Sequence, residues 1–296
     1  MPGEFDFIQW VCSQQKPSPL ALLPAGDDLA ILRWPANDLL LVGVDQMLDG
    51  VHFDSNLHTP REIGRKAMNR NLSDCAAMGC LPAAAVTTVA SHRGSGLQFL
   101  QELYTGMREA ADLHGCQIVG GDTGSWDGKW VVTVTILGRC EGVAPITRRG
   151  AQPGDGIYVT GPLGGSILGR HMTFEPRVAE GRRIAMAGAT SMIDLSDGLS
   201  RDLPHLCEQS GVGAILDASA IPIHADAIRL AARDSVSPLD HALHDGEDYE
   251  LLYTCRRGVS NLPGVLIGTI TENTGVFLSQ AGRVERLVPN GWEHSL

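Results

Sequence analysis

The sequence predicts a mixed α/β (α+β) fold in two domains, and three observations support this prediction. The chain has 296 residues, of which 43% are apolar, and this is enough for two packed cores at roughly 150 residues per domain. Strand-like and helix-like segments alternate along the chain. At 144–156 the composition changes to proline, glycine and arginine (APITRRGAQPGDG), which is typical of a domain boundary. We therefore expect domains at 1–145 and 146–296.

The first half reads as β-α-β-α-β-β, and its first helix has the clearest signals. Thr59, Pro60 and Glu62 form a capping box with proline at the first helical position, and Gly79 followed by Pro82 ends the helix. The other elements are predicted from apolar, β-branched runs or from helical periodicity. The expected strands are 38–44, 83–90, 117–119 and 129–138, and the expected helices are 60–78 and 96–114.

The second half begins with a strand followed by a glycine-rich loop, Gly161–Gly169 (GPLGGSILG). This loop loosely suggests a dinucleotide-binding turn, and its N–H groups could hold an anion, although such a loop is more often a tight turn before a helix. No Walker P-loop occurs in the sequence. The expected strands are 156–160, 191–195 and three near residues 214, 250 and 265, and the expected helices are 177–187 and 199–209.

Charge and cysteine content narrow the classes of partner and compartment. The net charge is 23 − 34 = −11 and no run of lysine or arginine occurs, so neither nucleic acid nor a membrane is an expected partner. The seven cysteines form no C-x-x-C pair and are expected to be reduced. The first residues, MPGEFDFIQW, do not resemble a signal peptide, and no stretch approaches the roughly 18 apolar residues of a membrane span, so we expect a cytoplasmic protein.

Several aspartates share one local setting, beside glycine or serine at the end of an element. One such aspartate is more often a helix cap or a turn residue. Together, carboxylates without accompanying histidine or cysteine favour Mg²⁺, which takes one or two carboxylates per ion plus waters and phosphates. Without a P-loop, a protein that uses ATP would hold its phosphates chiefly through such metals. The aspartates lie at 27, 28, 45, 74, 122, 194 and 197.

A series of short motifs, none decisive alone, follows in a specific order along nearly the whole chain. They are GEF at 3–5, GDD at 26–28, Asp45 with GVHF at 50–53, GRKA at 64–67, NLSD at 71–74, GGDT at 120–123, PGD at 153–155, IDLSDGL at 193–199, GEDYELL at 246–252 and GWEH at 291–294. In order and spacing they resemble the thiamine-monophosphate kinases, in the superfamily of aminoimidazole-ribonucleotide synthetase and selenophosphate synthetase.

The resemblance implies the superfamily's two-domain fold, a homodimer formed by the N-terminal sheets, and phosphorylation of thiamine monophosphate by ATP. Direct transfer to a phosphate oxyanion needs little help from a general base, so we expect no catalytic acid or base and a cluster of Mg²⁺ ions that offsets the crowded charge. The resemblance assigns Asp27, Asp45, Asp74, Asp122, Asp194 and Asp197 to Mg²⁺, Tyr104, Gly121, Asp122, Arg148 and Ser196 to ATP, and His52, Glu247 and Trp292 to thiamine monophosphate.

Each assigned residue also has a purely structural interpretation. His52 could be a surface histidine, Tyr104 a residue of a helix core, and Trp292 a side chain packed against the body of the protein. Lys66 and Arg70 lie two turns and one turn before Asp74, where i, i+4 charge pairing explains them as well as phosphate contact does, so neither is assigned.

The sequence departs from the resembled pattern at three places. Val44 and Gln46 stand where threonines usually flank Asp45, His244-Asp245 replaces Ser-Gly before Gly246, and the link from 169 to 177 is short. Two other functions therefore stay open. One is another ATP-dependent enzyme of the superfamily, and the other is a catalytically silent nucleotide-binding homologue.

Overall fold

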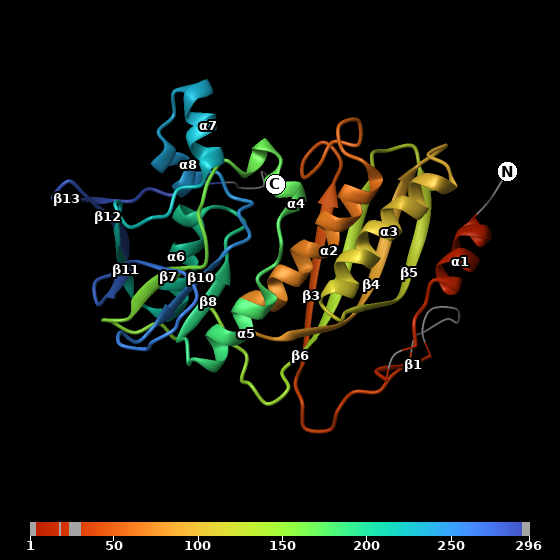
Figure 1. Ribbon diagram of the computed structural model, residues 1–296, viewed down its shortest axis with the longest axis horizontal. Coiled ribbons are helices and arrows are strands. Elements are labelled where there is room, and N and C mark those ends of the chain that lie inside the picture. Colours follow the sequence, from red (N-terminus) through yellow and green to blue (C-terminus); the bar gives the residue numbers. More distant parts are fainter. Residues whose placement is uncertain (1–3, 18, 24–30, 292–296) are drawn as a thin grey trace. The chain divides into compact units, whose positions relative to one another are not determined.

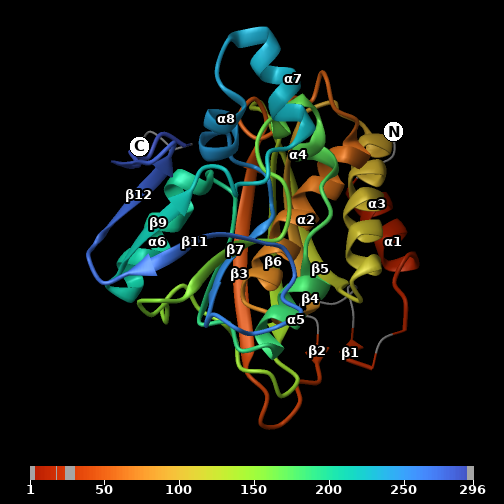
Figure 2. The ribbon, with the colours of Figure 1, turned by 60° about the vertical axis from the view of Figure 1, so that its left-hand side comes forward.

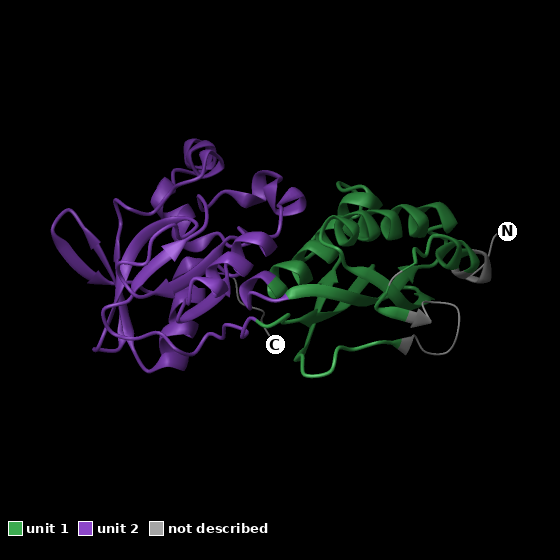
Figure 3. Cartoon of the chain, turned by 60° about the horizontal axis from the view of Figure 1, so that its bottom comes forward, with its two compact units in different colours: residues 1–75, 81–142 green, residues 76–80, 143–296 purple. Residues whose placement is uncertain are grey.

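The computed structural model describes residues 4–17, 19–23 and 31–291 (Figure 1). They form two compact units, Met1–Cys75 with Leu81–Gly142 and Ala76–Cys80 with Val143–Leu296 (Figure 3). The predicted mixed α/β class is confirmed, because each unit has its own sheet and helices. The expected boundary at 145/146 lies close to residues 142 and 143, where the longer segments of the two units meet. None of the described helices is long and apolar enough to cross a membrane.

The first unit is built on a four-stranded sheet with helices on one face. Its elements are α1 (Glu4–Ser13), β1 (Ala21–Leu23), β2 (Ile31–Leu32), β3 (Leu40–Leu48), α2 (Pro60–Ala77), β4 (Leu81–His92), α3 (Leu97–Leu113), β5 (Gln117–Trp126) and β6 (Val131–Arg139). The strands lie in the order β3-β6-β4-β5, with β4 and β5 parallel and the other neighbours antiparallel. α2 and α3 lie on the same face of the sheet (Figures 1 and 2), and α1 packs on α3.

The opposite face of this sheet is apolar and exposed. Leu40, Val42 and Val44 alternate along β3 and are 51%, 64% and 66% exposed. The register places them opposite alternate residues of β6, and Val86 of β4 continues the same face. We call this surface the open face and define it by Leu40, Val42, Val44 and Val86. In most proteins an apolar sheet face of this kind is buried against another surface.

The second unit is built on a seven-stranded sheet in the order β13-β12-β9-β11-β7-β10-β8. Most neighbouring strands are antiparallel, and β9 and β12 are parallel. The elements are β7 (Gly156–Val159), the 3₁₀ helix η1 (Ser166–Leu168), α4 (Arg170–Thr173), α5 (Val178–Met186), β8 (Ser191–Asp194), α6 (Leu199–Ser210), β9 (Gly213–Asp217), α7 (Ala225–Asp234), α8 (Pro238–His244), β10 (Leu251–Cys255), β11 (Val265–Thr271), β12 (Gly275–Gln280) and β13 (Arg283–Arg286).

Helix α6 covers the core of the second unit. Leu199, Leu203 and Leu206 recur at helical spacing and are fully buried, together with Ile157 of β7 and Leu216 of β9. The helix contacts β8, β9 and β12, so its apolar face lies across the sheet. Its N-terminus therefore starts just beyond the end of β8, where Asp194, Ser196 and Asp197 occur.

The five residues Ala76–Cys80 belong to the second unit although the chain enters them from α2. The Ile146 N–H donates to the Met78 carbonyl at 3.0 Å, and Arg182 donates to the Gly79 carbonyl at 3.3 Å. Gly181 of α5 packs so closely here that a Cβ would lie 2.2 Å from the Ala76 carbonyl oxygen. This segment is therefore held by α5 and by the chain that leads into β7.

Every predicted helix and strand is present, with changed ends. The expected strand at 38–44 continues to Leu48, and the one at 117–119 continues to Trp126. The elements that were not predicted are α1, β1, β2, η1, α4, α7, α8, β12 and β13. All seven cysteines are free thiols, as expected; six are buried and Cys12 is half-buried.

Candidate functional site

A polar stripe on α2, formed by Lys66, Arg70 and Asp74, faces β3 and the turn that follows it. Lys66 is fully buried, and its ammonium group donates to the His52 carbonyl at 2.7 Å. The His52 Nδ1 accepts from the Leu48 N–H at 3.0 Å, so a neutral His52 carries its proton on Nε2. The assigned substrate residue His52 is thus held at both its backbone and its ring.

The next residue of the stripe, Arg70, pairs with the assigned metal ligand Asp45. The Arg70 Nε lies 2.7 Å from Asp45 Oδ2, and its Nη2 donates to Oδ1 at 3.1 Å. One turn later, Asp74 is exposed, and its Oδ2 lies 3.9 Å from the position that a Cβ would take at Gly43. Gly43 and Asp45 share one face of β3, so the structure brings Asp45, Asp74 and Arg70 together, the last of which was not assigned from the sequence.

Asp122 lies on the other face of the same sheet. The parallel register pairs Gly121 with Thr87 and Asp122 with Thr88, and Thr88 alternates with Val86 on the open face. Asp122 and Gly121 are both exposed. Within one chain, Asp122 is therefore separated by the sheet from Asp45 and Asp74. Asp27 lies outside the described residues, which contain no group of three or more His, Cys, Asp or Glu side chains able to hold a metal ion.

The two departures beside Asp45 also face away from it. Val44 belongs to the open face, and the Gln46 side chain donates to Thr133 of β6 at 3.3 Å. Because side chains alternate along a strand, Val44 and Gln46 lie on the same face as Asp122 rather than Asp45. Any hydroxyl lost at these positions would have been lost from the open face.

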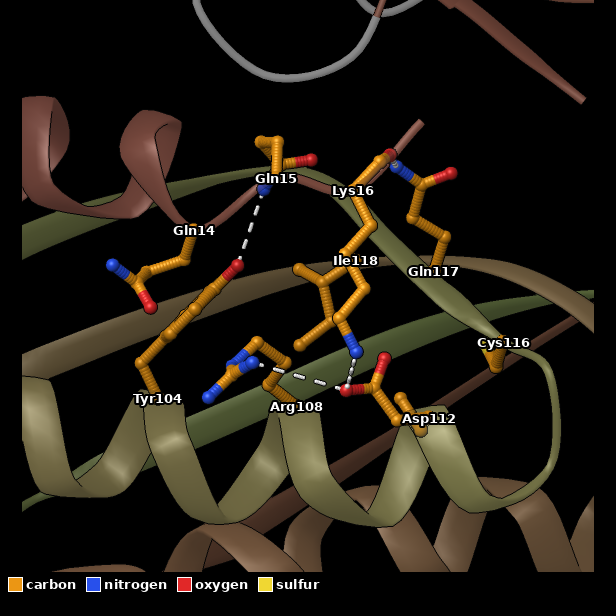
Figure 4. A pocket seen from close by; sticks show the side chains of 10 residues that line it. Gln14, Gln15, Lys16, Tyr104, Arg108, Asp112, Cys116, Gln117 and Ile118 are labelled. Carbon is orange, nitrogen blue, oxygen red and sulfur yellow. Dashed lines mark hydrogen bonds and ion pairs between the residues drawn. The ribbon is translucent and has the colours of Figure 1, made fainter. Parts of the chain in front are cut away.

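Tyr104 is a buried residue of α3, covered by α1. It is 4% exposed, and its ring meets Phe7 and Trp10 edge to face. Its hydroxyl accepts from the Gln15 side chain at 3.2 Å at the edge of a water-sized cavity of about 20 Å³ (Figure 4). Burial raises the pKa of Tyr104 to about 12. The assigned ATP contact of this residue stays a prediction.

In the second unit, the turn after β8 and the loop before β10 run side by side. The Glu247 N–H donates to the Ser196 carbonyl at 2.7 Å, and the Tyr249 N–H donates to the Leu195 carbonyl at 2.9 Å. These bonds bring the assigned residues Ser196 and Glu247 together. Glu247 and Ser196 are half-exposed, whereas Gly246 and Asp248 on either side of Glu247 are buried.

A third carboxylate, Asp202, joins Asp194 and Asp197 here and was missed from the sequence. It is 2% exposed, and its Oδ2 accepts from the Asp197 N–H at 3.1 Å. Burial, and then the charges of Asp197 and Asp194, raise the pKa of Asp202 to about 8. An acid in the first turn of a helix, five residues after another aspartate, was the signal available in SDGLSRD.

The assigned residue Arg148 lies at the C-terminal end of α6. Arg148 is exposed, and its carbonyl accepts from Ser210 at the C-terminal end of this helix. Twelve residues of α6 span about 18 Å, so the Arg148 backbone is far from Ser196 at the other end. Trp292 lies outside the described residues. Gly291, immediately before it, accepts from Arg201 at 2.9 Å at the N-terminal end of α6.

Comparison with known proteins identifies the family. The N-terminal domain model of AIR synthase related proteins matches residues 26–140. The chain is 36% identical to the thiamine-monophosphate kinase of Rhodopirellula baltica over 98% of this chain and 97% of that protein. It is 31% identical to the thiamine-monophosphate kinase of Bacillus subtilis over 92% of each chain.

Among solved structures, AaThiL complexed with AMPPCP and TMP matches with a TM-score of 0.81 and 28% identity, over 99% of this chain and 97% of that one. The predicted two-domain fold of the superfamily is therefore confirmed. With a relative at 36% identity along almost the whole length, the chain belongs to the thiamine-monophosphate kinase family within the AIR synthase-like superfamily.

Proposed function

We propose that this protein transfers the γ-phosphoryl group of ATP to thiamine monophosphate and so forms thiamine diphosphate. The observation that carries the proposal is the match to AaThiL complexed with AMPPCP and TMP, which covers 99% of this chain. Both units therefore have counterparts in a protein that binds an ATP analogue and TMP together. No described residue needs to act as a base, because the acceptor is a phosphate oxyanion.

The carboxylates of both units fit a requirement for Mg²⁺. In the second unit, Asp202 lies buried beside Asp194 and Asp197, and a divalent cation would offset this crowded negative charge. In the first unit, Asp45 already attracts a cation, the Arg70 guanidinium. Asp45 and Asp74 in the first unit, and Asp194 and Asp197 in the second, would each hold Mg²⁺, which would supply charge neutralisation for the phosphate groups.

The chain's own residues bind and orient the substrates. Glu247 presents a half-exposed carboxylate, which suits the cationic thiazolium ring or the N–H groups of the aminopyrimidine. Ser196 lies directly beside it through the backbone bond between the two segments. A contact to ATP would then lie next to a contact to thiamine monophosphate, and positioning of two phosphates accounts for most of the catalysis in phosphoryl transfer.

A homodimer would cover the open face. Leu40, Val42 and Val44 form an apolar row on an edge strand, and Val86 extends it across the sheet. A second copy of the chain packed on this face would bury these side chains, and no other segment of the chain would be needed to cover them. It would also place the Asp122 of each chain, which lies on this face, at the contact between the two copies.

The test is a coupled assay of the purified protein with ATP, Mg²⁺ and thiamine monophosphate. We expect thiamine diphosphate to form only when all three are present. Asp194→Asn should lower turnover by on the order of 100-fold, since an electrostatic contribution of several kcal/mol is lost. The exposed Asp217, whose carboxylate accepts from Ser219, provides a matched control, and Asp217→Asn should leave turnover unchanged.

Two results would contradict the proposal. Consumption of ATP with a different acceptor would indicate another enzyme of the superfamily. ATP binding without any product would indicate a catalytically silent homologue.

A further inference from the structure

The glycine-rich loop Gly161–Gly169 holds anions that belong to its own chain. The Gly164 N–H donates to both carboxylate oxygens of Asp248 at 3.0 Å. The Gly165 N–H donates to Asp245 Oδ2 at 2.7 Å. The two N–H groups that would receive a phosphate in a nucleotide-binding turn are therefore occupied by side-chain carboxylates.

The glycines are required by the tight packing of this loop. Gly164 and Gly165 have φ of 89° and 73°, in the left-handed region that favours glycine. A Cβ at Gly164 would lie 2.6 Å from the Ala242 nitrogen of α8, and a Cβ at Gly165 would lie 2.3 Å from the Asp226 carbonyl carbon of α7. The loop is thus held between two helices with its N–H groups directed at Asp245 and Asp248.

Both carboxylates have cationic partners that keep them in place. Asp248 is 3% exposed and accepts from Arg170 at 2.7 Å. Asp245 lies 2.9 Å from the His241 Nδ1, and the His241 Nε2 lies 3.3 Å from Asp234. Burial lowers the pKa of His241, but its hydrogen bonds to Asp245 and Asp234 outweigh this and raise it overall, which favours the charged imidazolium.

Gly246 and Glu247 are the two residues between these anchored carboxylates. The φ of Glu247 is +51°, and Gly246 and Tyr249 also have positive φ, of 73° and 52°. Glutamate and tyrosine rarely adopt this conformation, so it persists only where the surroundings hold it. Ser166 of η1 adds a further bond by donating to the Gly246 carbonyl at 2.8 Å.

We propose that the loop Gly161–Gly169 is an internal clamp rather than a nucleotide site, and that Asp245 is a positioning residue that fixes Glu247 for recognition of the non-phosphate part of the substrate. The identity of that substrate, thiamine monophosphate, rests on the proposed function. Asp245 is not proposed to contact any reacting atom. It acts through the Gly165 N–H and the backbone that leads to Glu247.

The experiment compares Asp245→Ala, Asp245→Asn and the control Asp234→Ala in the full-length protein. Asp234 is the other carboxylate on His241 and makes no bond to the glycine-rich loop in the described contacts. We expect Asp245→Ala to raise the KM for thiamine monophosphate by about tenfold, with kcat and the KM for ATP within about twofold. Asp245→Asn should raise this KM much less than Asp245→Ala does, because the asparagine amide oxygen still accepts from the Gly165 N–H.

A double-mutant cycle separates positioning from a general loss of stability. In a Glu247→Gln background, Asp245→Ala should change the KM for thiamine monophosphate by less than about twofold, because the contact that it positions is already impaired. An equal, roughly tenfold change in both backgrounds would overturn the proposal. So would a change confined to the KM for ATP, which would mean that the glycine-rich loop binds nucleotide.

Hydrogen exchange tests the clamp independently of the reaction. Asp245→Ala should speed exchange of the Gly165 and Glu247 amides by about tenfold or more relative to wild type, and Asp234→Ala should not. If wild type forms no thiamine diphosphate, the proposed function fails while this measurement still decides the clamp. Unchanged exchange at both amides would overturn it.

Discussion

Replacing Asp202 with asparagine should remove most of the pH dependence of stability that the second unit owes to its carboxylate cluster. Asp202 is 2% exposed, and its pKa is raised from 3.8 to about 8 by burial and by Asp197 and Asp194. The folded protein therefore keeps this proton to a higher pH than the unfolded chain does. Its contribution to stability is complete below about pH 4 and is lost as the pH rises toward about 8.

The size of the effect follows from the shift. Each pKa unit corresponds to about 1.4 kcal/mol, so between about pH 5 and pH 8 the wild type loses at most about 4 kcal/mol through this residue. Asparagine is neutral at every pH, and its amide oxygen still accepts from the Asp197 N–H. The free energy of unfolding of the variant should therefore rise relative to that of the wild type as the pH rises.

Scanning calorimetry of both proteins at these two pH values is the assay, since it measures how the stability of each protein changes with pH. The control is Asp217→Asn, because Asp217 is exposed and its pKa is lowered by hydrogen bonds from Ser219. Stability curves of wild type and Asp202→Asn that stay parallel from about pH 5 to pH 8 would refute the reasoning.

Two further outcomes are expected. Val42→Arg, on the open face, should convert the proposed dimer into monomers, measured by sedimentation velocity. The control is Leu113→Arg on α3, where Leu113 is 72% exposed, and it should leave the dimer intact. A Val42→Arg variant that stays dimeric would mean that the interface lies elsewhere. Arg70→Gln should weaken binding of ATP measured by calorimetry and make it depend more steeply on Mg²⁺, because the pairing cation of Asp45 is lost; an unchanged Mg²⁺ dependence would mean that Asp45 binds no metal.

The sequence predicted those elements whose signals are local. The helix at 60–78 was found because Thr59 and Glu62 cap each other, and the structure shows the Thr59 N–H and hydroxyl both donating to Glu62 at 2.8 Å. The second part of β5, GGDTGSW, has no strand pattern and exists because it pairs with β4 along its whole length. α7 was missed because its cap is a histidine, His224, which accepts from the Asp226 N–H.

The sequence predicted individual residues of the candidate site but not how they are arranged in space. Sequence spacing does not show whether residues on two distant strands lie on the same face of a sheet. The separation of Asp122 from Asp45 was therefore not predicted. Arg70 was left unassigned because helical charge pairing explains it equally well in a sequence, and only the packing of α2 on β3 reveals its bond to Asp45. Asp202 was missed because its burial depends on tertiary structure.

The segment Ala76–Cys80 determines how this protein can be dissected. A fragment that ends at Gly142 keeps these residues but loses α5 and Ile146, so the Met78 carbonyl and the surface of Ala76 that Gly181 covers become exposed to solvent. A fragment that begins at Val143 keeps α5 but lacks the segment packed on it. Neither fragment coincides with a whole compact unit. Expression of separate halves should therefore yield poorly behaved material, and a protease cut near residue 142 should leave two pieces that stay associated.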